Sequence, residues 1–273
     1  MRPFLACLLL FSCVLTGCGS ARSEGDQFAR IRAEGVLRVG VKADSPPFGT
    51  MVGKNRSGFD LDIAYALGAR LGVEKVEFTT VTSADRLDRL KHGEVDLVIA
   101  STTRTRSRER DVDFSMPYFE DGQALLVTAG SPIASYLDLA GKRVGVVQGS
   151  TSLGNLKQVA PGCIPITVDS FDALAQSLAL GRVDAITSDR LILMGLQRRT
   201  PALASARLAG EPFTAEPYGI ALAENQSRLR KAIDHALMGM WEDGEYQRIR
   251  DTWFGTGTSY ALPERFALPV YPR

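Results

Sequence analysis

The sequence predicts an α/β protein made of two similarly built lobes. Short apolar runs typical of strands alternate with stretches of helical periodicity, and this order occurs twice along the 273 residues. Two motifs recur in the same order, although repeats this short can also arise by coincidence: residues 38–41 (RVGV) return at 143–146, and residues 93–98 (GEVDLV) return as GRVDAI at 181–186. A chain of this length can hold two domains of about 100 to 150 residues. We therefore expect a β-α-β-α-β unit in each lobe.

The first copy of this unit begins after Gly35. Its first helix is predicted by apolar side chains that fall on one helical stripe closed by Gly72, and Ser83 is expected to cap the next helix. In chain order we expect a strand at 36–41, a helix at 59–71, a strand at 76–81, a helix at 83–91, a buried strand at 95–100 and, near the C-terminus, two helices across 229–253 broken near Gly244.

The second copy places two polar residues at equivalent positions. Its helix at 170–180 corresponds to the second helix of the first copy, and aligning Gly93 with Gly181 puts Ser101 and Asp189 just after the carboxyl end of a buried strand. Ligands of open α/β sheets bind outside these strand ends. We expect both residues to face a cleft shared by the two lobes.

The charge balance is nearly neutral. There are 32 Lys and Arg against 31 Asp and Glu, a formal net charge of +1, which argues against a nucleic-acid-binding protein. Hydrophobic residues make up 45%, as in soluble globular proteins with a sizeable core. The sequence contains no Gly-x-Gly-x-x-Gly, Walker or Gly-x-Ser-x-Gly motif, and its two histidines, His92 and His235, are far apart. We expect no catalytic residues, no metal site and no cofactor.

The first residues have the layout of an export signal. Arg2 precedes an apolar stretch at 4–15, and the segment ends in Leu-Thr-Gly-Cys at Cys18, which looks like a bacterial lipobox. We expect residues 1–17 to be removed as a lipoprotein signal peptide. Cys18 would then carry the lipid that anchors the exported protein to a membrane, in the periplasm or at the cell surface, with 18–27 as a polar tether. The alternative is a plain signal peptide that happens to end near a Cys.

Two loops carry groups suited to an anion. Residues 101–110 (STTRTRSRER) combine hydroxyls with four Arg side chains at an expected helix N-terminus. This set suits a carboxylate, and a solvated basic helix start is the alternative. The loop at 148–152 (QGSTS) is rich in small residues that can form an anion nest. Asp189 supplies the opposite charge, with a helix N-cap as its alternative role.

Several further motifs, each weak alone, follow one another in a specific order and spacing. They are GVLRVGV at 35–41, PPF at 46–48, GFDLD at 58–62, GEVDL at 93–97, Arg108 with DFSMPY at 113–118, GRVDA at 181–185 and WFG at 253–255. With them the chain resembles the bacterial family 3 solute-binding proteins, the polar amino acid receptors of ATP-binding-cassette (ABC) importers. The resemblance covers nearly all residues after the signal. It implies a periplasmic-binding-protein-like fold of type II, with two βαβ lobes joined by a two-crossing hinge that closes on an amino acid.

The resemblance also divides the chain. Lobe 1 is expected to comprise residues 28–119 and a returning segment at 218–255, and lobe 2 residues 120–217, with the hinge crossings at its ends. Residues 256–273 are expected to pack on lobe 1 as an extended tail. The expected partners are an amino acid ligand and the permease of an importer, and the protein is expected to be a monomer.

Five residues take roles in ligand binding from matching positions in the family. Arg108 would clamp the α-carboxylate together with Thr103 and with Thr151 from the second lobe. Ser101 would accept a hydrogen bond from the α-ammonium of the ligand, and Asp189 would neutralise the charge of this ammonium. A zwitterion in a closed cleft loses its water, so each of its charges needs such a partner.

The side-chain pocket decides the substrate. Relatives that bind acidic amino acids look similar at Lys42 and Arg86, and two cations suit a second carboxylate. The alternative is that Lys42 is a surface charge at a strand end and that Arg86 pairs with an acid on its own helix. The positions where glutamine-type relatives carry stacking aromatics are Ser45 and Ser83 here, which weakens a neutral or basic substrate.

The leading hypothesis is therefore a lipid-anchored receptor that binds L-glutamate or L-aspartate and delivers it to an ABC importer. A neutral polar amino acid, glutamine or asparagine, is the alternative within the same class. An enzyme resembling cyclohexadienyl dehydratases is a third reading, for which Glu120 or Asp121 would have to serve as the acid. A sensor lobe that docks on a membrane kinase is a fourth. We expect a binding protein and not an enzyme.

Overall fold

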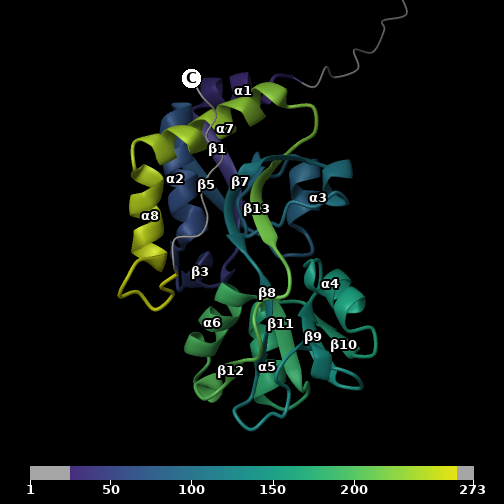
Figure 1. Ribbon diagram of the computed structural model, residues 1–273. Helices are drawn as coiled ribbons and strands as arrows, with labels where there is room; N and C mark the ends of the chain where they lie inside the picture. The colour runs from purple at the N-terminus through teal and green to yellow at the C-terminus, as the bar shows by residue number, and fades with distance from the viewer. Residues whose placement is uncertain (1–24, 263–273) are drawn as a thin grey trace, which may run out of the picture.

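The computed structural model describes residues 25–262. The expected signal peptide 1–17 and the lipidation site Cys18 lie outside the described residues, and the expected tail is described only as far as Leu262. Figure 1 shows two lobes stacked one above the other, joined by β7, β8 and β13. The predicted α/β fold of type II is confirmed.

The upper lobe contains a five-stranded mixed sheet in the order β5-β1-β6-β13-β7. Strands β5 and β6 run parallel to β1, while β13 is antiparallel to both β6 and β7. The strands are β1 (Val36–Val41), β5 (Lys75–Thr80), β6 (Leu97–Val98), β7 (Asp113–Asp121) and β13 (Glu216–Leu222). A small antiparallel sheet beside it consists of β2 (Asp44–Ser45), β3 (Gly49–Val52) and β4 (Asn55–Ser57).

The lower lobe repeats this arrangement in the order β10-β9-β11-β8-β12. Here β10 and β11 run parallel to β9, and β8 is antiparallel to β11, so the first strand again lies between its second and third. The strands are β8 (Gln123–Val127), β9 (Arg143–Val147), β10 (Ile164–Val168), β11 (Ala185–Asp189) and β12 (Arg207–Leu208). The motif repeats in the sequence therefore correspond to a structural duplication.

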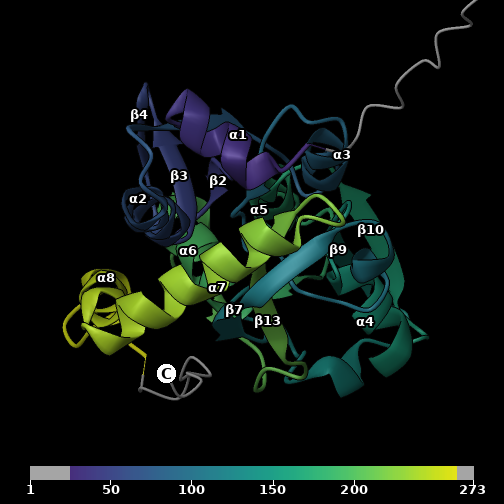
Figure 2. The same cartoon turned by 90° about the horizontal axis from the view of Figure 1, so that it is seen from above.

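Most predicted helices are present, because their apolar stripes and end signals are local. Helix α2 ends at Gly72, and Gly244, with φ +77, separates α7 from α8. The α-helices are α1 (Gln27–Glu34), α2 (Phe59–Leu71), α3 (Arg86–Lys91), α4 (Ser152–Val159), α5 (Phe171–Ala179), α6 (Arg190–Arg199), α7 (Ser227–Glu242) and α8 (Glu245–Phe254), and the 3-10 turns are η1 (Arg108–Arg110), η2 (Tyr136–Asp138) and η3 (Pro201–Leu203). Seen from above, α7 lies beside α1 over the upper lobe and leads into α8 (Figure 2).

Three local expectations are wrong. The helix expected from Ser83 begins only at Arg86, and Ser83 does not cap it, because its hydroxyl accepts a hydrogen bond from Lys42. The helix expected within 101–110 is reduced to the turn η1, and the third strand is shorter than expected. Ser101 stops that strand in a left-handed conformation (φ 47), after which Thr103 forms a bridge with Tyr218.

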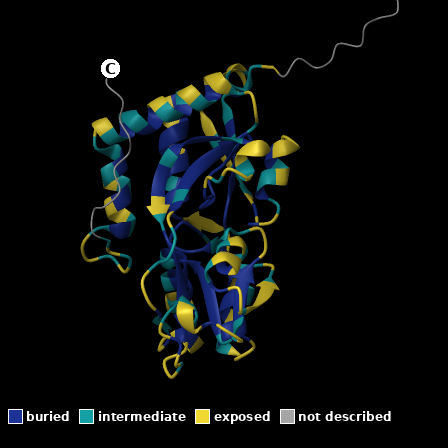
Figure 3. Ribbon diagram, turned by 45° about the vertical axis from the view of Figure 1, so that its right-hand side comes forward, coloured by how far each residue is buried: buried dark blue, intermediate teal, exposed yellow. Residues whose placement is uncertain are grey.

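Both sheets are buried at their centres, as Figure 3 shows by the dark strands inside each lobe. Their apolar side chains form the core that holds the strand ends, and therefore the polar residues after them, in fixed positions. Among residues 25–262, no helix is long and apolar enough to cross a membrane.

Candidate ligand-binding site

A small cavity lies between the two lobes. Its wall includes hydroxyls of Ser45 and Ser83 and the apolar side chains of Phe171 and Ile192. Six of the predicted binding residues line it: Lys42, Arg86, Ser101, Thr103, Thr151 and Asp189. The seventh, Arg108, lies in a neighbouring hollow that also touches Thr151. The structure thus brings together residues that are up to 147 positions apart (189 − 42) in the chain.

Arg86 is buried, with 4% of its surface exposed. Its Nη1 donates to the carbonyl oxygens of Ala100 (2.6 Å) and Ser101 (3.4 Å), and its Nε has no hydrogen-bond partner. Among the described residues no carboxylate lies within ion-pair distance of it, because the acids on its own helix pair elsewhere: Asp85 with Arg89 and Asp88 with Lys91. Burial, with the nearby Arg108, lowers the pKa of Arg86 to about 9. The guanidinium is still largely charged at neutral pH.

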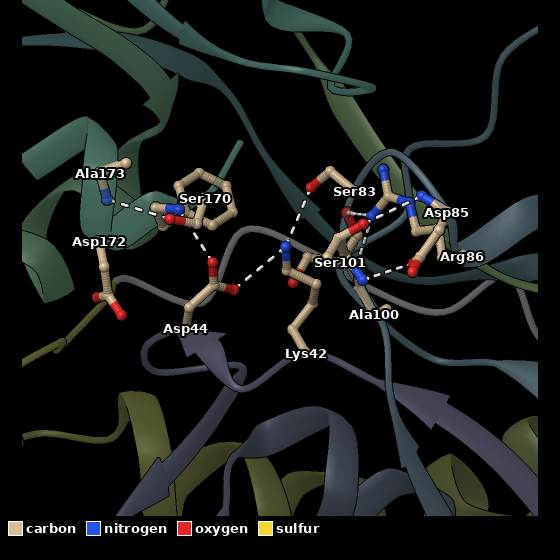
Figure 4. Close-up of polar contacts among 12 residues, drawn as sticks. Lys42, Asp44, Ser83, Asp85, Arg86, Ala100, Ser101, Ser170, Asp172 and Ala173 are labelled. Atoms are coloured by element: carbon tan, nitrogen blue, oxygen red, sulfur yellow. Dashed lines mark hydrogen bonds and ion pairs between the residues drawn. The ribbon is translucent and has the colours of Figure 1, made fainter. Parts of the chain in front are cut away.

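Lys42 is equally buried, with 2% exposed, but it is well supplied with partners (Figure 4). Its Nζ lies 3.1 Å from Ser83 Oγ and 3.1 Å from Asp44 Oδ1, and 4.8 Å from the centre of the Phe171 ring. Burial lowers the pKa of the Lys42 ammonium, and Asp44 opposes that shift. Lys42 is therefore not the surface charge of the alternative interpretation.

Ser101 is held by Asp60, a residue that the sequence analysis missed. The carboxylate Oδ2 of Asp60 accepts from Ser101 N (2.8 Å) and Ser101 Oγ (3.3 Å), while Oδ1 accepts from the Tyr118 hydroxyl (2.7 Å). Complete burial raises the pKa of Asp60 to about 7, although these hydrogen bonds lower it. Asp60 belongs to the first turn of α2. Acidic residues are common there because they interact favourably with the helix dipole, so the sequence alone did not indicate a second role.

Asp189 lies at the end of β11 but does not cap α6 with its side chain. Its Oδ2 accepts a short hydrogen bond from the hydroxyl of Tyr218. Burial raises the pKa of Asp189 to about 8, and the neighbouring carboxylates of Asp121 and Glu216 raise it further. A cationic group placed beside Asp189 would favour its ionised form.

Glu216 is the second residue that the sequence analysis missed, and it bridges the lobes from the start of β13. Its Oε2 accepts from Thr103 Oγ1 (2.6 Å) of the upper lobe and Thr151 Oγ1 (3.0 Å) of the lower lobe. Its Oε1 accepts from Asn155 Nδ2 (2.7 Å) and Thr214 Oγ1 (2.9 Å). A hydroxyl has one proton to donate, so in this structure both threonine hydroxyls expected to bind a ligand carboxylate donate to Glu216.

Arg108 also spans the cleft. Its Nη1 donates to Thr103 O (2.7 Å) and its Nη2 to Gly149 O (2.9 Å) in the lower lobe. A further contact joins Asp44 Oδ2 to the backbone N–H of Phe171 (2.9 Å). The lobes are therefore in contact around the cavity, in a closed arrangement.

A metal ion has no evident place here. Within residues 25–262 no three His, Cys, Asp or Glu side chains come close enough to hold one. What the cavity offers is a set of cationic donors, one buried carboxylate and several hydroxyls, which suits a small ligand that carries charges of both signs.

Comparison with known proteins decides the family. The family model described as "Bacterial extracellular solute-binding proteins, family 3" matches residues 37–256. The chain belongs to this family. The predicted resemblance is confirmed, and the solute-binding role follows from the family.

Several relatives of this solute-binding protein have been named for a ligand. It is 39% identical to the ABC transporter glutamine-binding protein GlnH of Bacillus subtilis over 91% of this chain and 95% of that one. It is 33% identical to the glutamate-binding protein GluB of Corynebacterium glutamicum over 90% and 87%. Among solved structures, an ancestral arginine-binding protein bound to glutamine is 43% identical, with a TM-score of 0.77 over 81% of this chain and 98% of that one.

Proposed function

We propose that this protein captures an acidic amino acid, L-glutamate or L-aspartate, outside the cytoplasm and delivers it to an ABC importer. The observation that carries the proposal is the buried guanidinium of Arg86, which lines the cavity and has no carboxylate partner among the described residues. Arg86 and Lys42 donate hydrogen bonds and accept none, whereas a carboxylate only accepts. Each charge-assisted bond of this kind contributes about 1.5 to 3 kcal/mol.

The remaining groups suit the part that all amino acids share. Arg108 would bind the α-carboxylate with Thr103 and Thr151, which would have to turn their hydroxyls away from Glu216 or offer backbone N–H groups instead. Ser101 and Asp189 would receive the α-ammonium. The cation beside Asp189 would then ionise a carboxyl that burial otherwise tends to keep protonated.

Glutamine is the second candidate, and two observations favour it. Glutamine-binding proteins are among the most similar relatives. In addition, an amide NH2 needs an acceptor, and Ser45 Oγ is buried in the cavity wall without a hydrogen-bond partner. The two candidates therefore differ in whether the ligand side chain meets Arg86 or a serine hydroxyl.

Calorimetry separates the acidic ligand from glutamine. Wild type and Arg86→Met are each titrated with glutamate, aspartate, glutamine and asparagine. We expect wild type to prefer an acid, and Arg86→Met to lose about a hundredfold in acid affinity, because two charge-assisted bonds of about 1.5 kcal/mol each disappear. Glutamine affinity should change less than tenfold. The control is Arg89→Met, since Arg89 lies on the same helix but pairs with half-buried Asp85 and exposed Glu94. An unchanged acid-to-amide preference in Arg86→Met would contradict the acidic proposal.

Two accessory parts of the proposal have their own tests. We propose a lipid on Cys18, which predicts that alkaline hydrolysis of its ester-linked acyl chains lowers the intact mass of the exported protein. We also propose that the protein performs no turnover. Product formation from prephenate or arogenate would instead support the dehydratase alternative, to which one neighbour is related: an ancestral amino acid-binding precursor of cyclohexadienyl dehydratase, 32% identical with a TM-score of 0.75.

A further inference from the structure

Asp44, in β2 of the upper lobe, contacts both a cation that lines the cavity and the opposite lobe. Its Oδ1 lies 3.1 Å from Lys42 Nζ, and its Oδ2 accepts from the backbone N–H of Phe171 at 2.9 Å. Figure 4 shows the carboxylate between Lys42 on one side and the start of α5 on the other. One carboxylate therefore serves a cavity cation and a helix that belongs to the other lobe.

The contact with α5 completes the cap of that helix. Ser170 is the N-cap, and its Oγ accepts from Ala173 N at 3.1 Å, which leaves other N–H groups of the first turn without a partner in the helix. Asp44 satisfies the one on Phe171, and its negative charge also suits the positive end of the helix dipole. The Phe171 ring in turn lies 4.8 Å from Lys42 Nζ. This set of contacts joins the two lobes in the closed arrangement.

The same carboxylate determines how much positive charge the ligand side chain meets. Lys42 and Arg86 line the cavity together, but the charge of Lys42 is already balanced by Asp44 at ion-pair distance. A ligand carboxylate would have to share the Lys42 ammonium with Asp44 and would be repelled by it, whereas a neutral amide would not be repelled. Asp44 should therefore reduce the advantage of an acidic ligand over its amide.

We propose that Asp44 is a specificity-determining residue that acts through Lys42. It neutralises the Lys42 ammonium and so limits the preference for acidic ligands. Because the same carboxylate also binds the start of α5, this neutralisation is linked to closure of the lobes. The inference rests on the proposed function in one respect, namely that the ligand side chain enters the part of the cavity lined by Lys42 and Arg86. It does not depend on whether wild type prefers the acid or the amide.

The test is the ratio of dissociation constants, Kd(glutamine)/Kd(glutamate), measured by calorimetry in wild type and Asp44→Asn. Loss of the contact with α5 should weaken lobe closure, and so raise both dissociation constants by the same factor, which leaves their ratio unchanged. Loss of the negative charge beside Lys42 should strengthen glutamate binding relative to glutamine binding, and we expect the ratio to rise at least tenfold. The matched control is Asp172→Asn, which removes the same charge from the exposed first turn of α5, where Asp172 pairs with Arg199. Its ratio should stay within twofold of wild type.

Two further variants keep the test decisive. Asp44→Glu retains the charge, so its ratio should stay within threefold of wild type. In a Lys42→Met background, Asp44→Asn should no longer shift the ratio, because the residue acts through Lys42. An unchanged or smaller ratio in Asp44→Asn, or a shift that persists without Lys42, overturns the proposal. A wild type that prefers glutamine would contradict the acidic specificity proposed above and leave the shift itself to be judged independently.

Discussion

Gly149 gives a direct test of whether ligand binding requires the closed arrangement of the lobes. It belongs to the loop before α4 in the lower lobe and has a φ of +77. A Cβ atom at this position would lie 2.4 Å from Ser83 O and 2.5 Å from the Cα of Ala84, both of which are backbone atoms of the upper lobe. Because backbone cannot swing away as a side chain can, Gly149→Ala should force the lobes apart by roughly 1 Å to restore ordinary van der Waals separation.

The size of the effect follows from the neighbouring contact. Arg108 Nη2 donates to Gly149 O at 2.9 Å, and a separation of roughly 1 Å would take this bond beyond hydrogen-bonding distance. A hydrogen bond from a charged donor contributes about 1.5 to 3 kcal/mol. We therefore expect Gly149→Ala to weaken amino acid binding by about ten- to a hundredfold. An L-residue at this left-handed φ also costs about 1 to 2 kcal/mol of folding stability.

Calorimetry and small-angle scattering of the liganded protein measure the two consequences, a higher Kd and a larger radius of gyration. The control is Gly181→Ala, since Gly181 has a similar φ of +64 but no atom within 4 Å of an added Cβ. This variant should lose similar thermal stability and bind as wild type does. If Gly149→Ala binds within threefold of wild type, the reasoning that links this lobe contact to affinity is refuted.

Three further predictions concern buried carboxylates. At pH 7 the Asp189 carboxyl, with its pKa raised to about 8 by burial, is mostly protonated, so binding of an α-ammonium should release up to one proton. Calorimetry in two buffers of different ionisation enthalpy should show this release in wild type and not in Asp189→Asn. Glu216→Ala removes the shared acceptor of Thr103 and Thr151, so a fluorescence donor–acceptor pair across the ligand-free cleft should report a longer distance, and an unchanged distance would contradict this. Burial raises the pKa of Asp60 from an ordinary 3.8 to about 7, so at pH values between these two the carboxyl takes up a proton when the protein folds. The free energy of unfolding should therefore fall as pH rises from about 4 to 7. Urea unfolding of Asp60→Asn should show a flatter pH dependence.

The fold was largely predictable because its strongest signals are local. Helix α2 and the break at Gly244 follow from periodicity and from glycines at helix ends. The start of α3 was not predictable, because Ser83 is a good cap by composition but is recruited by Lys42, 41 residues earlier. Local preference was overridden by a tertiary contact that no window of sequence contains.

The placement of two candidate site residues was predictable from the duplication. Aligning the two repeats was enough to place Ser101 and Asp189 on one cavity, since equivalent strand ends face each other in the closed structure. Asp60 and Glu216 were not predicted because their roles depend on contacts with residues far away in the chain. Asp60 accepts hydrogen bonds from Ser101, which has a positive φ, and Glu216 accepts hydrogen bonds from hydroxyls of both lobes. Acids at a helix start and at a strand end have ordinary explanations, and only the three-dimensional structure shows that these two are buried.

The distribution of partners in the closed cleft explains how a nearly neutral protein can favour an anionic side chain. Lys42 is balanced by Asp44, and Arg108 bonds backbone carbonyls while the charge of Glu216 lies nearby. Arg86, like Arg108, is held by carbonyl dipoles and has no acid at ion-pair distance within the described chain, but Arg86 lines the cavity whereas Arg108 lies in the neighbouring hollow. Burying a charge in this way is costly unless a counter-charge arrives. The discrimination between acid and amide should therefore reside mainly in Arg86, with Asp44 limiting what Lys42 adds.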